Sequence, residues 1–337
     1  MTASLASPAI VAVVAFVLAL ALTPALRAAA SRFGLLDRPN LRSSHQAVVP
    51  RGGGVAIAAA VLGALTLARP GLGGRLTPVL LGAVALAVVG LCDDRYSLPA
   101  GVRVAAQLIV ALAVVAGLGG LERMPLPPPF DWPLGALGAP LAAFWIVAIV
   151  NFFNFLDGID GLAALQAAIT GLGMMLAGWD PSTSLLAGAL AGAAAGFLPF
   201  NWAPASVFLG DAGSYFLGFT LAALPLAAPP EGRPGAVLFV ALSLWLFLAD
   251  ATWTLARRAR RGARVHEAHR EHLYQQLARR WGHARVTLSI GMASAVLTAI
   301  ALAAHRSESP AWAWAALGLA AAFFAAEAVA ATTERAA

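Results

Sequence analysis

The residues best suited to chemistry are carboxylate and amide side chains set in apolar surroundings. Asp93 and Asp94 are adjacent and close a long apolar run. Two carboxylates beside a membrane are costly unless a cation shares their charge, and Mg²⁺ prefers such oxygen ligands. The pair therefore indicates a site that binds a divalent cation or handles phosphate. A solvated helix end, with Arg95 as local partner, is the alternative that the pair alone leaves open.

A denser polar group lies in the segment NFFNFLDGIDGL, residues 151–162. Two Asn and two Asp interrupt an apolar run there, and a glycine follows each Asp. Helix capping would need one such side chain rather than four. The segment therefore indicates binding of a polar ligand by Asn151, Asn154, Asp157 and Asp160.

A third polar segment, FLGDAGS at residues 208–214, places Asp211 between glycines at the start of another apolar run. An Asp at this position can cap the helix, or it can hold a metal ion where a helix N-terminus also attracts phosphate. Asn201, ten residues earlier, offers an amide at the same place.

The basic segments are suited to anions. In the first loop, Asp37, Arg42, His45 and Arg51 surround the glycine run PRGGG. Free N–H groups of glycines and the guanidinium groups of arginines both bind phosphate. We therefore interpret this loop as an anion-binding segment.

The last loop carries His266, His269 and His272 at a spacing unlike the HExxH motif of zinc hydrolases. A diphosphate is a better expected ligand than zinc. The arginines from 257 to 261 are interpreted as setting topology and contacting anionic headgroups. Asp250 is interpreted as extending toward these arginines from the end of an apolar run.

Membrane helices must position these segments. The chain has 337 residues, 60% hydrophobic and 11% charged, with a mean hydropathy of +0.79, which excludes a soluble globular enzyme. A bilayer core needs about 20 apolar residues per helix. We predict one all-α, polytopic membrane domain, residues 1–337, with about ten to eleven spans. The eleven predicted spans are 5–27, 53–68, 76–92, 103–120, 134–151, 161–178, 184–200, 213–228, 236–256, 285–304 and 312–330.

Charge predicts the orientation of these spans. The net charge is +6, all 22 basic residues are Arg, and 17 of them fall on one side of the eleven-span arrangement. The positive-inside rule then places the N-terminus outside and every polar segment on the cytoplasmic side. The basic excess therefore indicates topology rather than nucleic-acid binding. Cys92 is the only cysteine, which excludes an internal disulfide.

Taken in order, these motifs resemble the polyprenyl-phosphate N-acetylhexosamine-1-phosphate transferase superfamily, the membrane enzymes of glycosyltransferase family 4. The pattern NxxNxxDGIDGL at 151–162 and the pattern GDxGS at 210–214 are the specific parts. The first loop is more similar to the N-acetylglucosamine-1-phosphate branch, and the segment AHREHLYQQL is similar to members that initiate O-antigen. Two departures are Ser97, where members often carry an acidic residue, and the spacing of His269 and His272 in place of three consecutive histidines.

The resemblance implies transfer of an N-acetylhexosamine-1-phosphate from a UDP-sugar to undecaprenyl phosphate, releasing UMP, as the first membrane step of a cell-envelope polysaccharide. It implies a bacterial inner-membrane protein with a cytoplasmic active site, surrounded by membrane lipid, and it leaves a homodimer open. The expected catalytic residues are Asp93, Asp94, Asp211, His269 and His272, and the first three are the expected ligands of Mg²⁺ or Mn²⁺. The residues expected to bind substrate are Asn154, Asp157, Asp160, Asn201, Phe208, Arg42, His45, Arg51 and Arg270.

Three alternatives remain at this point. The chain could belong to the phospho-N-acetylmuramoyl-pentapeptide transferase branch of the same superfamily. A secondary transporter that uses membrane Asp residues is a different class, but transporters place their sites near the bilayer midplane and usually contain two related halves. A receptor or scaffold without chemistry would leave five polar segments unexplained.

Overall fold

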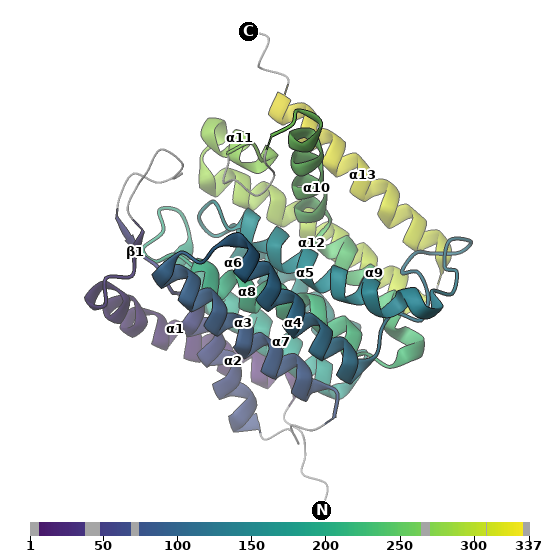
Figure 1. The fold of residues 1–337 in the computed structure, drawn as a ribbon, viewed down its shortest axis with the longest axis horizontal. Coiled ribbons are helices and arrows are strands. Elements are labelled where there is room, and N and C mark those ends of the chain that lie inside the picture. Colours follow the sequence, from purple (N-terminus) through teal and green to yellow (C-terminus); the bar gives the residue numbers. More distant parts are fainter. Residues whose placement is uncertain (1–6, 38–47, 69–73, 264–269, 308, 333–337) are drawn as a thin grey trace, which may run out of the picture.

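The structure is a computed structural model, and it describes residues 7–37, 48–68, 74–263, 270–307 and 309–332. Within these residues the chain forms thirteen α-helices and a single short β-hairpin (Figure 1). The predicted all-α class is confirmed. Four residues of the expected loops, Arg42, His45, His266 and His269, lie outside the described residues.

The helices follow one another with short connections. They are α1 (Pro8–Arg32), α2 (Gly54–Ala68), α3 (Leu76–Tyr96), α4 (Ala100–Leu118), α5 (Gly138–Leu156), α6 (Leu162–Ala177), α7 (Pro181–Asn201), α8 (Gly210–Ala223), α9 (Arg233–Ser243), α10 (Trp245–Arg260), α11 (Leu273–Trp281), α12 (His283–Ser307) and α13 (Pro310–Thr332). Three 3-10 turns are η1 (Gly135–Leu137), η2 (Leu224–Ala227) and η3 (Pro230–Gly232). The hairpin pairs β1 (Leu36–Asp37) with β2 (Val49–Pro50).

Among the described helices, seven are long and apolar enough to cross a membrane, namely α1, α3, α4, α5 with η1, α7, α12 and α13. An eighth candidate joins α8 to α9 through a bend of 118°. Helices α2 and α6 are apolar but have only 15 and 16 residues. A polytopic membrane protein is thus confirmed, whereas eleven spans are not reached on length and composition alone.

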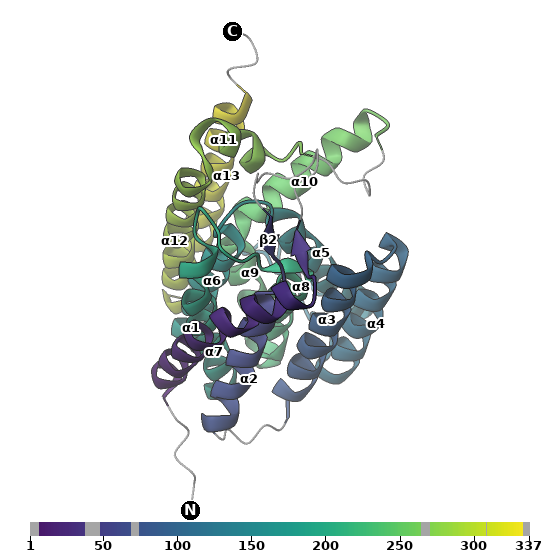
Figure 2. The same ribbon diagram turned by 90° about the vertical axis from the view of Figure 1, so that its left-hand side faces the viewer.

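The predicted ninth span, 236–256, is wrong as a continuous helix. Helix α9 ends at Ser243 and α10 begins at Trp245, with Leu244 between them. Helix α10 carries a buried acid, Asp250, and ends in arginines, and it extends away from the bundle (Figure 2). Polar groups of this kind need protein partners, which a helix lying in hydrocarbon would lack.

The centre of the bundle is α8, whose residues from Ala212 to Ala223 are all buried. Helices α3, α5, α2 and α6 pack around it. Nearby, α1 crosses α7 at glycines spaced four residues apart. A Cβ at Gly192 would overlap the carbonyl of Ala12, and Gly188 and Gly196 meet the α1 backbone in the same way. Small residues let two membrane helices approach closely, so this pattern anchors the first helix.

One end of the bundle collects the polar segments. Helices α3, α5 and α7 end there, while α6, α8 and α12 begin there. At the other end of the bundle, a buried arginine joins two segments. The buried side chain of Arg233 donates to the carbonyls of Gly120 and Leu118 and pairs with Glu122. The arrangement therefore brings the sequence motifs together on one side and leaves structural contacts on the other.

Candidate active site

The glycine run of the first loop is bound to the segment before α8. The N–H groups of Gly53 and Gly54 donate to the carbonyls of Phe208 and Leu209, each at 2.9 Å, and the N–H of Phe208 donates to the carbonyl of Pro50 at 2.9 Å. Our interpretation that these glycines offer free N–H groups to anions is therefore wrong for Gly53 and Gly54, because the backbone already uses them. Their small size serves close packing instead, since a Cβ on Gly54 would overlap Gly213.

The start of α8 is held by Asp94. Its two carboxylate oxygens accept hydrogen bonds from the N–H groups of Asp211 at 3.0 Å and Ala212 at 3.1 Å. Such bonds satisfy N–H groups that the first turn of a helix otherwise leaves unpaired. Asp94 thus caps α8 from α3, and this contact sets the position of Asp211.

Asp211 itself faces the end of α5. Its Oδ1 accepts a hydrogen bond from Nδ2 of Asn154 at 2.6 Å, and the same amide donates to Oγ of Ser214 at 2.9 Å. Asp94, rather than Asp211, caps the start of α8, so the helix-capping role considered for Asp211 is already taken by another residue. The structure therefore brings together the motifs at 151–162 and 208–214 through their side chains.

Asp157 follows the last residue of α5 and is partly buried. Within the part of the chain that the structure describes, its carboxylate has no hydrogen-bond partner. Burial raises the pKa of Asp157 well above its usual range, and the carboxylates of Asp211 and Asp94 raise it further. Three acidic groups thus lie close enough to repel one another, which is a setting that a bound cation would relieve.

The adjacent acid, Asp93, points elsewhere. Its buried carboxylate accepts hydrogen bonds from Arg103 at 3.1 Å, from the hydroxyl of Tyr215 at 3.0 Å and from the N–H of Leu98 at 2.8 Å. Neighbouring residues on a helix project about 100° apart, so the pair divides between two sets of partners. Arg103 and Tyr215 were not singled out from the sequence, because neither belongs to a polar motif.

Two of the expected substrate-binding residues hold loops together. Oδ2 of Asp160 accepts from the N–H of Ala205 at 3.0 Å, and its Oδ1 lies 3.3 Å from Nδ1 of His283. Asn201 is buried and accepts from the N–H of Gly161 at 3.1 Å. These contacts join the loop after α5 to the loop after α7. The partly buried Phe208 follows in the same loop.

Arg51 directly follows the second strand of the hairpin. It forms an ion pair with Asp37 at 2.9 Å across the hairpin. Burial alone would lower the pKa of Arg51, but Asp37, with contributions from Asp94 and Asp211, raises it above its ordinary value. The guanidinium and those carboxylates therefore influence one another electrostatically.

The last loop is folded back onto the end of α5. The hydroxyl of Tyr274 donates to the carbonyl of Phe155 at 2.9 Å. His272 is buried, and its ring lies 6.2 Å from that of Phe155. The carbonyl of Arg270 accepts from Arg279 at 3.4 Å. All five polar segments are therefore connected at one end of the bundle.

Two arginines of α10 have protein partners, which differs from our interpretation that they contact anionic headgroups. Arg257 donates to the carbonyl of Glu271 at 2.8 Å, and Arg258, which is buried, pairs with the carboxylate of Glu271. Because protein groups already hold them, headgroup binding does not describe these two residues. Arg260 is exposed and remains suited to that role.

The carboxylates near the start of α8 are of the chemical kind that magnesium takes as ligands. Among the described residues, no three His, Cys or acidic side chains form a ready-made metal cage. Mg²⁺, however, is commonly bound by one or two carboxylates, several waters and substrate phosphates. Asp211 and Asp157 supply two carboxylates of this kind, in a setting where their charges repel.

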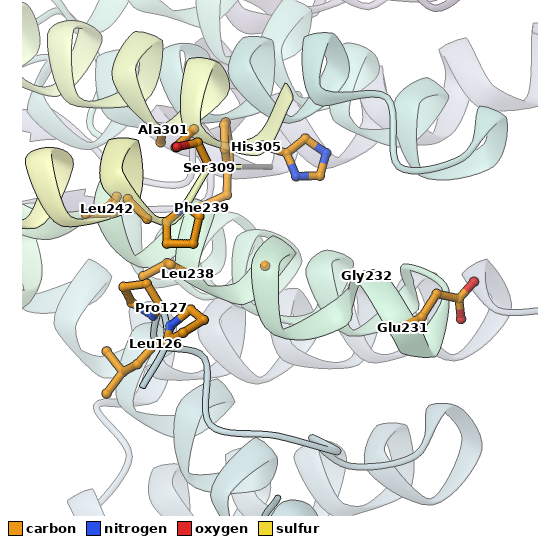
Figure 3. A pocket seen from close by; sticks show the side chains of 15 residues that line it. Leu126, Pro127, Glu231, Gly232, Leu238, Phe239, Leu242, Ala301, His305 and Ser309 are labelled. Atoms are coloured by element: carbon orange, nitrogen blue, oxygen red, sulfur yellow. The ribbon is translucent and has the colours of Figure 1, made fainter. Parts of the chain in front are cut away.

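A cavity of about 320 Å³ lies away from this site, at the other end of the bundle (Figure 3). Its lining combines the loop before α5 with η3, with α9 and with the residues around the turn between α12 and α13, and it is largely apolar. The side chain of Glu231 points away from the apolar residues in this view. The cavity therefore takes no part in the chemistry of the acidic group.

Comparison with known proteins identifies the family. The pattern of glycosyl transferase family 4 matches residues 76–228, which include Asp93, Asp94, Asp157 and Asp211. A probable undecaprenyl-phosphate N-acetylglucosaminyl 1-phosphate transferase of Bacillus subtilis is 30% identical over 79% of this chain and 76% of its own length. An undecaprenyl-phosphate alpha-N-acetylglucosaminyl 1-phosphate transferase of Salmonella typhi is 31% identical over 85% and 81%.

A phospho-N-acetylmuramoyl-pentapeptide-transferase of a Synechococcus species is also similar, at 32% identity over 83% of this chain and 82% of its own length. These relatives cover most of the chain, and the family pattern spans its central acidic residues. The chain therefore belongs to glycosyl transferase family 4, within the superfamily of polyprenyl-phosphate N-acetylhexosamine-1-phosphate transferases.

Proposed function

We propose that this protein transfers an N-acetylhexosamine-1-phosphate from a UDP-sugar to undecaprenyl phosphate, giving undecaprenyl-diphospho-sugar and UMP. The observation that carries the proposal is the acidic group of Asp94, Asp157 and Asp211 around the start of α8. The names of the relatives agree with this reaction. We assign the step to the start of a cell-envelope polysaccharide.

The reaction joins two anions, so neutralising charge is the main task. An oxygen of the lipid phosphate attacks the sugar-linked phosphorus, and the bond from that phosphorus to the UMP oxygen breaks. A Mg²⁺ ion held by Asp211 and Asp157 would supply positive charge to the diphosphate. A monoester phosphate with a second pKa near 6 is already mostly dianionic at about pH 7, so direct attack needs no strong base. We favour it over a covalent Asp intermediate.

Other residues of this chain position Asp211 and bind the phosphates. Asp94 holds α8 so that Asp211 faces the end of α5, and Asn154 orients the Asp211 carboxylate. We assign a phosphate-binding role to Arg51, which pairs with Asp37, and to His272, whose ring lies against Phe155 at the end of α5. We extend that role to Arg42, His45, His269 and Arg270 as a proposal. Phosphoryl transfer depends mainly on such alignment and charge stabilisation.

The direct test uses purified protein in nanodiscs with undecaprenyl phosphate, Mg²⁺ and one radiolabelled UDP-sugar at a time. We expect lipid-linked product from UDP-N-acetylglucosamine. Product only from UDP-N-acetylmuramoyl-pentapeptide would assign the chain to the other branch, which the Synechococcus relative represents. No lipid-linked product with any UDP-sugar would refute the proposal.

We place the active site on the cytoplasmic face of the bacterial inner membrane. The support is the side that carries 17 of the 22 arginines. In a Cys92→Ser background, Ala259→Cys at the polar end should react with an impermeant thiol reagent only from the cytoplasm. Ala136→Cys, at the other end, should react only from outside. Labelling of both from one side would contradict the proposed topology.

Nucleotide recognition is the second expectation. Uracil offers an N3–H donor between two carbonyl acceptors, whereas in cytosine N3 carries no hydrogen and an amino group replaces one of the carbonyls. A site built to pair with a donor discriminates against a ligand that lacks it, so UMP should inhibit at least about tenfold more strongly than CMP. Inhibition constants measured against the UDP-sugar check this. Equal inhibition by the two nucleotides would show that the base is not read.

A further inference from the structure

Asp250 is a fully buried carboxylate with an unusual number of donors. On α10, its Oδ1 accepts from the hydroxyl of Thr254 at 2.9 Å and from the N–H of Leu273 at 3.0 Å, and the same oxygen lies 3.2 Å from Nδ1 of His272. Its Oδ2 accepts from the N–H of Tyr274 at 3.1 Å. A buried charge is tolerated when several donors satisfy it in this way. The carboxylate of Asp250 therefore joins α10 to the start of α11.

These bonds converge on His272, the residue that precedes the first turn of α11. The side chain of His272 makes no capping bond of its own. The N–H groups of Leu273 and Tyr274, which have no partner inside the helix, are bound by Asp250. The same carboxylate holds the imidazole at Nδ1, so it restrains both the backbone and the ring of His272. A hydrogen bond at one ring nitrogen determines which nitrogen carries the proton.

The restraint acts beside the acidic group of the active site. Tyr274, two residues after His272, is bonded to the carbonyl of Phe155, and its hydroxyl fills the space next to Gly158. Asp157 lies between those two residues. His272 is therefore held at the end of α5 that carries a proposed metal ligand.

We propose that Asp250 is a positioning residue for the transfer reaction and acts through His272. It keeps the proton of the imidazole on Nδ1 and holds the ring at the end of α5, so that Nε2 is directed to the phosphates. The role of His272 in this statement rests on the proposed function. Among the residues that the structure describes, the charged and titratable groups around Asp250 are His272, Tyr274 and, from α13, Glu327.

The first test is a double-mutant cycle in nanodiscs, with UMP release as the readout. Asp250→Asn keeps the shape but loses the charge and one acceptor, and losing a partner that orients a functional His typically costs about 10- to 100-fold. We expect that loss in kcat, with KM for the UDP-sugar changed by less than about threefold. Adding Asp250→Asn to His272→Gln should cost less than about threefold more, because coupled residues are not additive.

The matched control is Thr254→Val, which removes one donor on the same buried helix face and leaves the carboxylate and His272 unchanged. It should alter kcat by less than about fivefold, because the N–H groups of Leu273 and Tyr274 and the imidazole still hold the carboxylate. Fully multiplicative effects of Asp250→Asn and His272→Gln would overturn the proposal, since Asp250 would then act independently of the imidazole.

The second test does not depend on activity or on folding of the Asp250 variant. Nitrogen-15 NMR of the histidine-labelled wild type should show a protonated Nδ1 for His272, identified by the signal that His272→Gln removes. An unprotonated Nδ1 overturns the proposal. A wild type without any transfer would refute the proposed function instead, and the NMR result would still decide whether Asp250 holds the ring as stated.

Discussion

Replacing Asp211 by Asn is expected to lower kcat by about a thousandfold or more while the helical bundle remains folded. The amide keeps the shape of the side chain and can still accept the hydrogen bond from Asn154, but it loses the negative charge. A bound metal ion supplies several kcal/mol of transition-state stabilisation, and about 1.36 kcal/mol corresponds to a factor of ten in rate. UMP release across a titration of Mg²⁺ measures the effect, and chelation of the metal should stop the wild type.

The matched control is Asp131→Asn. Asp131 forms a partly exposed ion pair with Arg123 at 3.0 Å at the other end of the bundle. Pairs of this kind are worth about 0 to 1 kcal/mol, so transfer should stay close to that of the wild type. If Asp211→Asn kept full activity at low Mg²⁺, Asp211 would have no role as a metal ligand.

Replacing Gly90, a glycine in α3, by alanine is also expected to lower the transfer activity strongly. Alanine is normally better than glycine in a helix interior by about 1 kcal/mol. At Gly90, however, a Cβ would overlap the carbonyl group of Asp211 and the backbone nitrogen of Ala212. Gly90→Ala must therefore push α8 away from α3. A displacement of about 1 Å at an active site can cost about a hundredfold in rate, and we expect a loss of that size in kcat/KM.

Gly101→Ala is the control for that substitution. Gly101 lies in the first turn of α4, and nothing lies within 4 Å of the position that its Cβ would take. The control should express and transfer sugar phosphate like the wild type. Normal activity of Gly90→Ala would show that α8 can shift without disturbing the reacting groups, and it would weaken the assignment of the site to the α3–α8 contact.

The helices themselves could be predicted because hydrocarbon imposes a simple requirement. Each span needs an uninterrupted apolar run, and such runs are visible in one dimension. The predicted spans 103–120 and 285–304 correspond to α4 (Ala100–Leu118) and α12 (His283–Ser307). The prediction was wrong for 236–256, because the helix breaks at Leu244 although the apolar run in the sequence continues through it.

Roles within the polar segments were harder to predict. Sequence reasoning treated Asp93 and Asp94 as one pair and Asp250 as a side chain directed to arginines. The structure separates the first two, since Asp94 binds the start of α8 and Asp93 binds Arg103 and Tyr215. It also places Asp250 against α11 rather than toward the arginines.

By itself, the sequence determined that this is an all-α membrane protein, which residues carry its charge and which motifs indicate its family. These properties depend on composition and on patterns within short segments. The tertiary structure alone decided that Asp94 caps the helix of Asp211, 117 residues later, and that Asp250 holds His272, 22 residues later. Hydrogen bonds between distant segments depend on how the helices pack, because a buried carboxylate takes whichever donors the packing brings within reach.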